Sequence, residues 1–421
     1  MRKKENTKKY FWVDWLQLFL IGLTAPLFLF PSMKYVWVVL IIPMIWICRR
    51  IIKKRFFART VLDWALVILL IQVFATCVIV PDLGFSLPKI AGVLLGLAFF
   101  YSIVALLTTE KLIKWGIIAF LGAGLILSVV GILGMQWNLA DDFEKIANTF
   151  ENISPKINWN LPGAKEGFNP NAIGGTLILI IPLCLGLLFS HIKKSEENHL
   201  ISYKVLSLII FFVIIFVTFS VLFFTQSIGS WIGLVIGIWI LLLPWKWKKL
   251  SLILILLLGA AMFLLNFDKA TSIFDVNKQK LLGREFKWII GIKTVSQNPF
   301  FGIGMNRLRQ LPSMGYTTAH AHNHFIHTGA ELGIPGLIAY LAILIGAGYM
   351  CFEIWRKSKI GWMRIATLGL GCGQLAHFIF GMTDSIPLGA KVGIFFWFSL
   401  GLITAMYNYM LRRNEQIKTD D

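Results

Sequence analysis

The sequence predicts an all-α, polytopic membrane protein with about twelve transmembrane helices, formed by residues 1–421 as a single integral membrane domain. Hydrophobic residues make up 57% of the chain and charged residues 14%, and the mean hydropathy is +0.74, far outside the range of soluble globular proteins. We therefore expect the protein to lie among membrane lipids and to bind no nucleic acid. Apolar runs long enough to cross about 30 Å of hydrocarbon as helix lie at 11–30, 33–48, 61–80, 90–108, 115–133, 171–190, 205–224, 229–245, 250–266, 334–355, 362–383 and 392–411.

The distribution of basic residues predicts the orientation of these spans, because Lys and Arg concentrate in cytoplasmic connections. With the amino terminus in the cytoplasm, the segments on the cytoplasmic side carry 26 of the 40 basic residues. An even number of spans returns the carboxy terminus to the same side, as Arg412 and Arg413 require. The first run has a basic leader like that of a signal peptide, but no small-residue cleavage site follows it, so we expect a mature helix.

Two connections are too long to be simple turns, and in this topology both lie on the extracytoplasmic side of the membrane. They are residues 134–170 and residues 267–333, and long structured loops are usually functional. The first contains two more acidic than basic residues, whereas residues 267–324 of the second contain five more basic than acidic ones. Exported loops normally avoid basic residues, although loops approaching about 60 residues escape that bias. Two interpretations are open: a solvated basic loop, or a loop that receives an anionic group such as a lipid diphosphate.

The spacing within the basic loop favours the second interpretation. In LLGREFKWIIGIKTVSQNP, at 281–299, apolar residues gather on one side of a helix. Arg284, Lys287, Gly291 and Thr294 recur at helical spacing on another side. Such a helix could lie in the outer interface with its cations toward a headgroup, and the Asn-Pro at its end would stop it.

Six sequence features follow one another in a recognisable order. They are FNPNAIGGTLILIIPL at 168–183, Gly-Arg at 283–284, Trp288, NPFFGIG at 298–304, HNHFIHTGAELGIPG at 322–336 and HFIFGMTDSIPLGAKVG at 377–393. Taken in this order, they resemble the O-antigen ligase and polymerase superfamily of bacterial integral membrane glycosyltransferases. The similarity thus spans about residues 160–400. One departure is Ile228 in TQSIGSW, where many members carry the arginine of a Ser-Arg-Gly turn.

This resemblance implies transfer of a glycan from an undecaprenyl-diphosphate donor to an acceptor hydroxyl, on the outer face of the bacterial cytoplasmic membrane. It implies inversion at the anomeric carbon and neither a cofactor nor a metal ion. The ligase type, with a lipid A core as acceptor, is slightly closer in the His-Asn segment. A polymerase that joins carrier-linked repeats is the alternative.

The expected chemistry assigns roles to individual residues. A departing diphosphate requires fixed cations, and the planar fork of Arg284 suits that task, with Lys287 beside it. Arg307, Arg309 or Lys165 could supply the cation that Ile228 does not.

His322 is the candidate base, because imidazole accepts a proton at neutral pH. Asn323 could orient its ring or bind a sugar hydroxyl, and Asp384 could hold His322 or a sugar. Asn171 and Glu331 could also contact or orient the substrate. Each of these assignments has a simpler alternative. Asp384 could be a plain helix-end carboxylate, Asn171 could belong to a helix cap, and Glu331 could simply begin the tenth span.

The chain places His320, His322, His324 and His327 within eight positions. Alternate or helical spacing of these residues is compatible with a zinc site. No cysteine lies nearby, however, and a basic loop repels a dication, so we predict that no metal is bound. For His324 and His327 we favour satisfied polar side chains at the lipid interface.

Two other classes of protein are open. A transporter of a lipid-linked or anionic solute would have ionisable residues near the middle of the membrane and an internal duplication, whereas here most of the notable charge lies outside and no repeat is visible. A catalytically inactive scaffold is the other alternative, because of Ile228.

Overall fold

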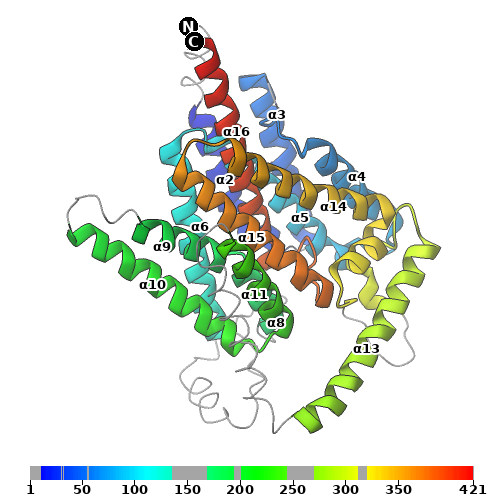
Figure 1. The fold of residues 1–421 in the computed structure, drawn as a ribbon. Helices are drawn as coiled ribbons and strands as arrows, with labels where there is room; N and C mark the ends of the chain where they lie inside the picture. The colour runs from blue at the N-terminus through cyan, green and yellow to red at the C-terminus, as the bar shows by residue number, and fades with distance from the viewer. Residues whose placement is uncertain are drawn as a thin grey trace.

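The computed structural model describes residues 11–134 except 30, 32 and 55, and residues 168–193, 201–243, 270–311 and 320–420 (Figure 1). Within these ranges the chain is helical and forms no β-strand. The helices are α2 (Phe11–Leu29), η1 (Met33–Leu40), α3 (Ile41–Lys53), α4 (Asp63–Ile79), α5 (Leu83–Leu106), α6 (Glu110–Gly134), α8 (Pro170–Leu177), α9 (Ile181–Lys193), α10 (Ile201–Phe224), α11 (Ile228–Leu242), α13 (Ala270–Gln297), η4 (Arg307–Gln310), α14 (His324–Lys357), α15 (Gly361–Thr383), η5 (Lys391–Gly393) and α16 (Ile394–Asp420).

The predicted class of fold, an all-helical polytopic membrane protein, is confirmed. In the described part of the chain, eight helices are long and apolar enough to cross a membrane, and Asp63–Ile79 and Ile228–Leu242 are apolar but shorter. The run expected at 33–48 is divided between η1 and α3. The run expected at 250–266 lies outside the described residues. The count of twelve spans therefore stays a prediction.

The central helices meet through small residues, which let two backbones approach closely. A Cβ atom added at Gly233 of α11 would lie 2.4 Å from the carbonyl oxygen of Ala376 in α15. On another side of α15, a Cβ atom at Gly373 would lie 2.6 Å from the carbonyl oxygen of Leu179. Because neither position has room for a larger residue, α11, α15 and the α8–α9 segment form one tightly packed unit.

Hydrogen bonds between helix ends indicate which ends lie together. Arg412 near the end of α16 donates to the carbonyl of Thr108, just after α5, over 3.3 Å. At the opposite end of α5, Asn306 of the basic loop donates to the carbonyl of Phe85 over 2.8 Å. Figure 1 shows the end of α16 at one end of the bundle and α13 toward the other. The basic loop and the end of α16 thus lie at opposite ends of α5, as the predicted topology requires.

Helix α14 begins at His324, ten residues before the expected tenth span, and it breaks at Gly333, where φ is 70° and ψ is 179°. Pro335 has no N–H to donate to the carbonyl of Glu331, so the break leaves helical carbonyls without their usual partners. The NPFFGIG turn supplies new ones: Gly304 N–H donates to Glu331 and Ile303 N–H donates to Ala330, both over 3.0 Å. The turn is thereby fixed against the first part of α14, next to the histidines.

Candidate active site

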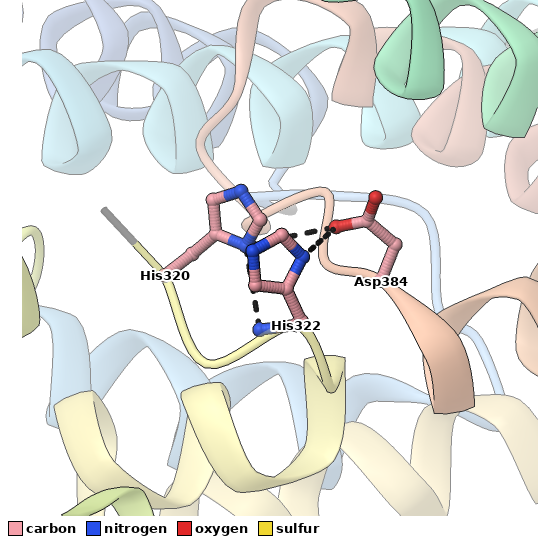
Figure 2. Close-up of side chains that lie close together, drawn as sticks. All are labelled: His320, His322 and Asp384. Atoms are coloured by element: carbon pink, nitrogen blue, oxygen red, sulfur yellow. Dashed lines mark hydrogen bonds and ion pairs between the residues drawn. The ribbon is translucent and has the colours of Figure 1, made fainter. Parts of the chain in front are cut away.

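Two histidines and an aspartate come together where α14 begins and α15 ends (Figure 2). The Nδ1 atom of His322 lies 3.3 Å from Oδ1 of Asp384, and Nδ1 of His320 lies 3.6 Å from the same oxygen. The two imidazole rings have centroids 4.0 Å apart. The His322–Asp384 approach has ion-pair distance without hydrogen-bond alignment. The contact that the sequence suggested between Asp384 and His322 is therefore present in the structure.

Asn323 fixes this arrangement by capping α14, a role for which its short amide side chain is well suited. Its Oδ1 atom accepts hydrogen bonds from the N–H groups of Phe325 and Ile326 over 3.0 and 3.1 Å. Its Nδ2 atom donates to the carbonyl of Met382 over 3.2 Å, which ties the start of α14 to the end of α15. His322, directly before the cap, has φ of 48°, a sparsely populated conformation for a residue with a side chain. Such strain is often found at functional sites.

Helix α13 covers the histidine loop from the other side. Trp288 Nε1 donates to the carbonyl of His322 over 3.4 Å. A Cβ atom at Gly291 would lie 2.4 Å from the side chain of Ile326, so α13 packs directly on the beginning of α14. The helix face that the sequence predicts to carry Arg284, Lys287, Gly291 and Thr294 therefore faces α14 at Gly291. Ile289 lies on another side of the helix and is 63% exposed.

The charges of α13 act on the histidine–aspartate group. Burial and the neighbouring charge of Arg284 lower the pKa of Lys287, and the charge of Asp384 raises it. Burial also lowers the pKa of His320 to about 3, so this ring is neutral at physiological pH. Burial raises the pKa of Asp384, but the contact with His322 outweighs it and holds the pKa below its usual value. The site therefore combines an ionised carboxylate, a neutral imidazole and at least one nearby cation.

The same three side chains have donor atoms within 4.8 Å of one another and are a candidate ligand set for a metal ion. The separations of 3.3 and 3.6 Å between Asp384 and the two histidines resemble those between ligands of tetrahedral zinc, which are about 3.3 Å for bonds of about 2.0 Å. Of the alternating histidines considered from sequence spacing, His320 and His322 lie together, whereas His324 instead approaches the hydroxyl of Ser385 at 3.3 Å. Lys287 lies near enough to act on His320 and opposes a second cation there.

A second histidine–carboxylate pair lies deeper in α14. His327 Nε2 is 3.3 Å from Oε2 of Glu331, one turn further along the helix, and their side chains are 5% and 3% exposed. Glu331 is thus inside the helix and buried against His327, rather than at the start of a span.

The structure places the other predicted residues in separate positions. Arg307 lines a cleft of about 550 Å³ with the exposed Phe300 and Phe301. Arg309 lies within electrostatic range of Lys89 in α5. Lys165 lies outside the described residues.

Asn171 lies in the first turn of α8, where the side chain of Asn169 accepts from its N–H over 2.9 Å. The cap is therefore formed by Asn169. Gly175 packs against Phe380, and Leu179 packs against Gly373, so the α8–α9 segment and α15 run antiparallel. Asn171 therefore lies at about the level of Asp384 along α15. Ile228 opens α11 close by, since its neighbour Gly229 touches Thr383.

Sequence reasoning missed His320 as a partner of Asp384, and it missed the packing of α5 at Lys89 against the segment that leads to Lys391. The alternation of His320 with His322 in the sequence indicates only a possible metal site. Lys89 and Lys391 carry no local signal, because each is a single basic residue at the outer end of an apolar run. Only the packing of α5 against residues 387–393 reveals that the two are neighbours.

The fold and site together define an integral membrane protein with a histidine–carboxylate centre beside basic residues. A family model described as O-antigen ligase matches residues 212–341, just under a third of the chain. This match includes α13, the NPFFGIG turn and His322, and it confirms the resemblance seen in the sequence. The family comprises glycosyltransferase-like enzymes of O-antigen and polysaccharide synthesis. A search of curated proteins found no match.

Proposed function

We propose that the protein transfers a glycan from an undecaprenyl-diphosphate donor to an acceptor hydroxyl, on the outer face of the bacterial cytoplasmic membrane, as an O-antigen ligase. The observation that carries this proposal is the approach of His322 to Asp384 beneath a helix that bears Arg284 and Lys287. All of these residues except Asp384 lie in the segment that matches the family. A base supported by a carboxylate, with cations alongside, is what displacement of a diphosphate requires.

In the proposed reaction the acceptor oxygen attacks the anomeric carbon while its proton passes to the free ring nitrogen of His322. The bond from the anomeric carbon to the diphosphate oxygen breaks, and its electron pair leaves with the diphosphate. Arg284 and Lys287 offset the negative charge that develops there, and Asp384 stabilises the imidazolium that forms. A single displacement inverts the anomeric centre, and the charges balance without a metal ion.

Lys287 also offers an answer to the missing arginine. Ile228 opens α11 near the end of α15, where Gly229 lies against Thr383, so an arginine at position 228 would bring a cation to the region of the site. Lys287 lies within electrostatic range of Asp384 and supplies a positive charge to the same region from α13. We propose that Lys287 replaces the family arginine. Arg307, Arg309 and Lys165 stay predictions as donor-binding residues.

The experiment that tests the proposal incubates purified protein with undecaprenyl-diphosphate glycan, with and without lipid A core, and separates the products on a gel. A single joined product that depends on the core is the expected result. A ladder of products without the core would identify the alternative, a polymerase. No product in either tube would contradict both enzymatic proposals and favour a transporter or a scaffold.

A further inference from the structure

Helix α4 is almost entirely apolar beyond its first turn, but it carries two buried polar side chains, Gln72 and Thr76. Gln72 is 5% exposed and Thr76 is completely buried, and the two lie one turn apart on the same side of the helix. Another side of α4 is exposed at Ile71, Phe74 and Val78. A buried amide in an apolar helix is costly unless its polar atoms have hydrogen-bond partners. The partners of Gln72 therefore indicate what the residue does.

The amide nitrogen of Gln72 donates two hydrogen bonds at the point where α14 breaks. It lies 3.1 Å from the carbonyl oxygen of Leu332 in α14 and 3.1 Å from that of Phe300 in the NPFFGIG turn. The amide is assigned in this orientation because the reverse would place its oxygen against both carbonyl oxygens. The stem of the side chain lies against Gly336, where an added Cβ atom would be 3.7 Å from Cγ of Gln72. One side chain of α4 thus joins the turn to α14.

These contacts complete the hydrogen bonding around the break. Gln72 donates to the carbonyl of Leu332, and the NPFFGIG turn donates to the carbonyls of the two residues before it. Beyond the break, the N–H of Ile334 donates back to the carbonyl of Pro299 over 2.7 Å. One turn further along α4, Oγ1 of Thr76 accepts from the N–H that follows the NPFFGIG turn, over 3.4 Å. The break in α14 is therefore held from α4 as well as from the turn.

The part of α14 before the break is directly connected to the candidate base. It runs from His324 to Leu332, is about 12 Å long, and begins at the Asn323 cap that follows His322. Because a short helix moves as a unit, a change of its angle at the break is carried to the loop at its other end. The separation of 3.3 Å between His322 and Asp384 joins two different helices, so it depends on that angle.

We infer that Gln72 is a positioning residue of the proposed transferase, which fixes the break in α14 and thereby keeps His322 at Asp384. The effect on catalysis rests on the proposed function, whereas the effect on α14 does not. Gln72 is buried and so has no contact with substrate in this role. It also lies outside residues 212–341, the segment that matches the family. A helix from the first part of the chain thus supports a site that the matched segment provides.

The first test measures hydrogen exchange by mass spectrometry on the purified full-length chain in detergent. Gln72→Met keeps nearly the same length and volume and removes both donated hydrogen bonds. We expect the peptides that cover residues 300–306 and 330–336 to exchange about tenfold faster in this variant, because the hydrogen bonds around the break open more often. Gln374→Met is the matched control. Gln374 is 6% exposed and donates to the hydroxyl of Ser399 in α16, away from the break, so its loss should leave these peptides at wild-type rates.

The second test varies donor and acceptor concentrations independently in the transfer assay, well below the melting temperature of each variant. Gln72→Met should lower kcat about 10²-fold, the cost of a displacement of about 1 Å in a catalytic group, and leave both KM values unchanged. Gln374→Met should keep the wild-type kcat. Gln72→Glu keeps the shape of the side chain and offers at most one O–H donor for the two carbonyls. Its kcat should lie between those of Gln72→Met and the wild type, and it serves if Gln72→Met does not fold.

Two kinds of result would overturn the inference. Wild-type exchange around the break in Gln72→Met would show that Gln72 does not fix α14. Faster exchange with a wild-type kcat, a changed KM with a wild-type kcat, or an equal loss of kcat in Gln374→Met would exclude a positioning role. The exchange measurement does not depend on catalysis. If the wild type transfers no glycan, the proposed function fails and the role in catalysis fails with it, while faster exchange would still establish that Gln72 holds the break.

Discussion

The two histidine–carboxylate pairs of this protein have the same separation and opposite surroundings. His322 and Asp384 approach to 3.3 Å, as do His327 and Glu331. The first pair joins a loop to a helix end, and its histidine side chain is 20% exposed. The second pair spans one turn within α14, and its histidine side chain is 5% exposed.

The difference shows that accessibility, rather than pairing, distinguishes a reactive centre from an internal one. A substrate hydroxyl can reach only a ring that is partly exposed, as the side chain of His322 is. His327 is enclosed by its own helix and its neighbours, so its charge can act on other groups but its nitrogens cannot meet a substrate. The predictions below separate these two roles.

The largest effect is expected for His322→Ala. Removal of the base should lower kcat by about 10²–10⁴-fold, the usual contribution of general base catalysis. Glycan transfer by purified protein measures this loss, and an unchanged melting temperature shows that the fold is intact. His327→Ala is the matched control, because it removes the equivalent ring of the other pair. Near-normal turnover by His322→Ala would exclude it as the base.

Arg284→Ala should follow, with a loss of about 10²–10³-fold, because one fixed electrostatic contact to the departing diphosphate disappears. Arg284→Lys should retain more activity, although a lysine lacks the forked geometry. Lys293→Ala provides a control on the same helix. If the alanine and lysine variants lost activity equally, the positive charge of Arg284 would not be what stabilises the leaving group. If both variants kept wild-type activity, Arg284 would have no role in transfer.

Asp384→Asn should lower kcat by about 10²-fold, because His322 loses its orientation. The variant should also move the acid limb of the pH–rate profile to lower pH. In the wild type the pKa of Asp384 is held below its usual value, so its negative charge persists through that limb and favours protonation of the adjacent imidazole. A neutral amide removes this effect, and the base then stays unprotonated to lower pH. An unmoved limb would show that Asp384 does not act through His322.

For the buried pair the expected effect is on stability. His327→Ala leaves the carboxylate of Glu331 without its close partner, and breaking a buried pair lowers the free energy of unfolding by about 3–5 kcal/mol. Thermal unfolding in detergent measures this change. The acid limb of the pH–rate profile should stay at its wild-type position. If instead His327→Ala moved the limb as Asp384→Asn does, the two pairs would not be functionally distinct.

The class of fold follows from the sequence because apolar runs and basic connections depend only on local composition. The same is true of the helix end at Gln297, which Asn298 and Pro299 predict. The early start of α14 could not be predicted in this way. A helix that begins at Asn323 and breaks at Gly333 depends on the carbonyl partners that the NPFFGIG turn provides, and such partners are set by tertiary contacts.

The candidate site was only half predictable for the same reason. His322 and Arg284 stand in motifs, and Asp384 stands near a third. The neighbours that determine their chemistry come from helices that are distant in the sequence.

The smallest expected effect is that of metal removal, which we expect to be none. His320, His322 and Asp384 offer a ligand set whose separations resemble those around zinc, so the geometry alone allows a metal. The electrostatics oppose it, because Lys287 acts on His320 and the charge of Arg284 acts on Lys287. Dialysis against EDTA should therefore leave the rate of transfer unchanged, as measured on the same preparation before and after treatment. Activity that is lost on chelation and restored by zinc would show that His320, His322 and Asp384 form a metal centre. In that case His320→Ala, which removes one ligand but leaves the proposed base, should prevent zinc from restoring activity.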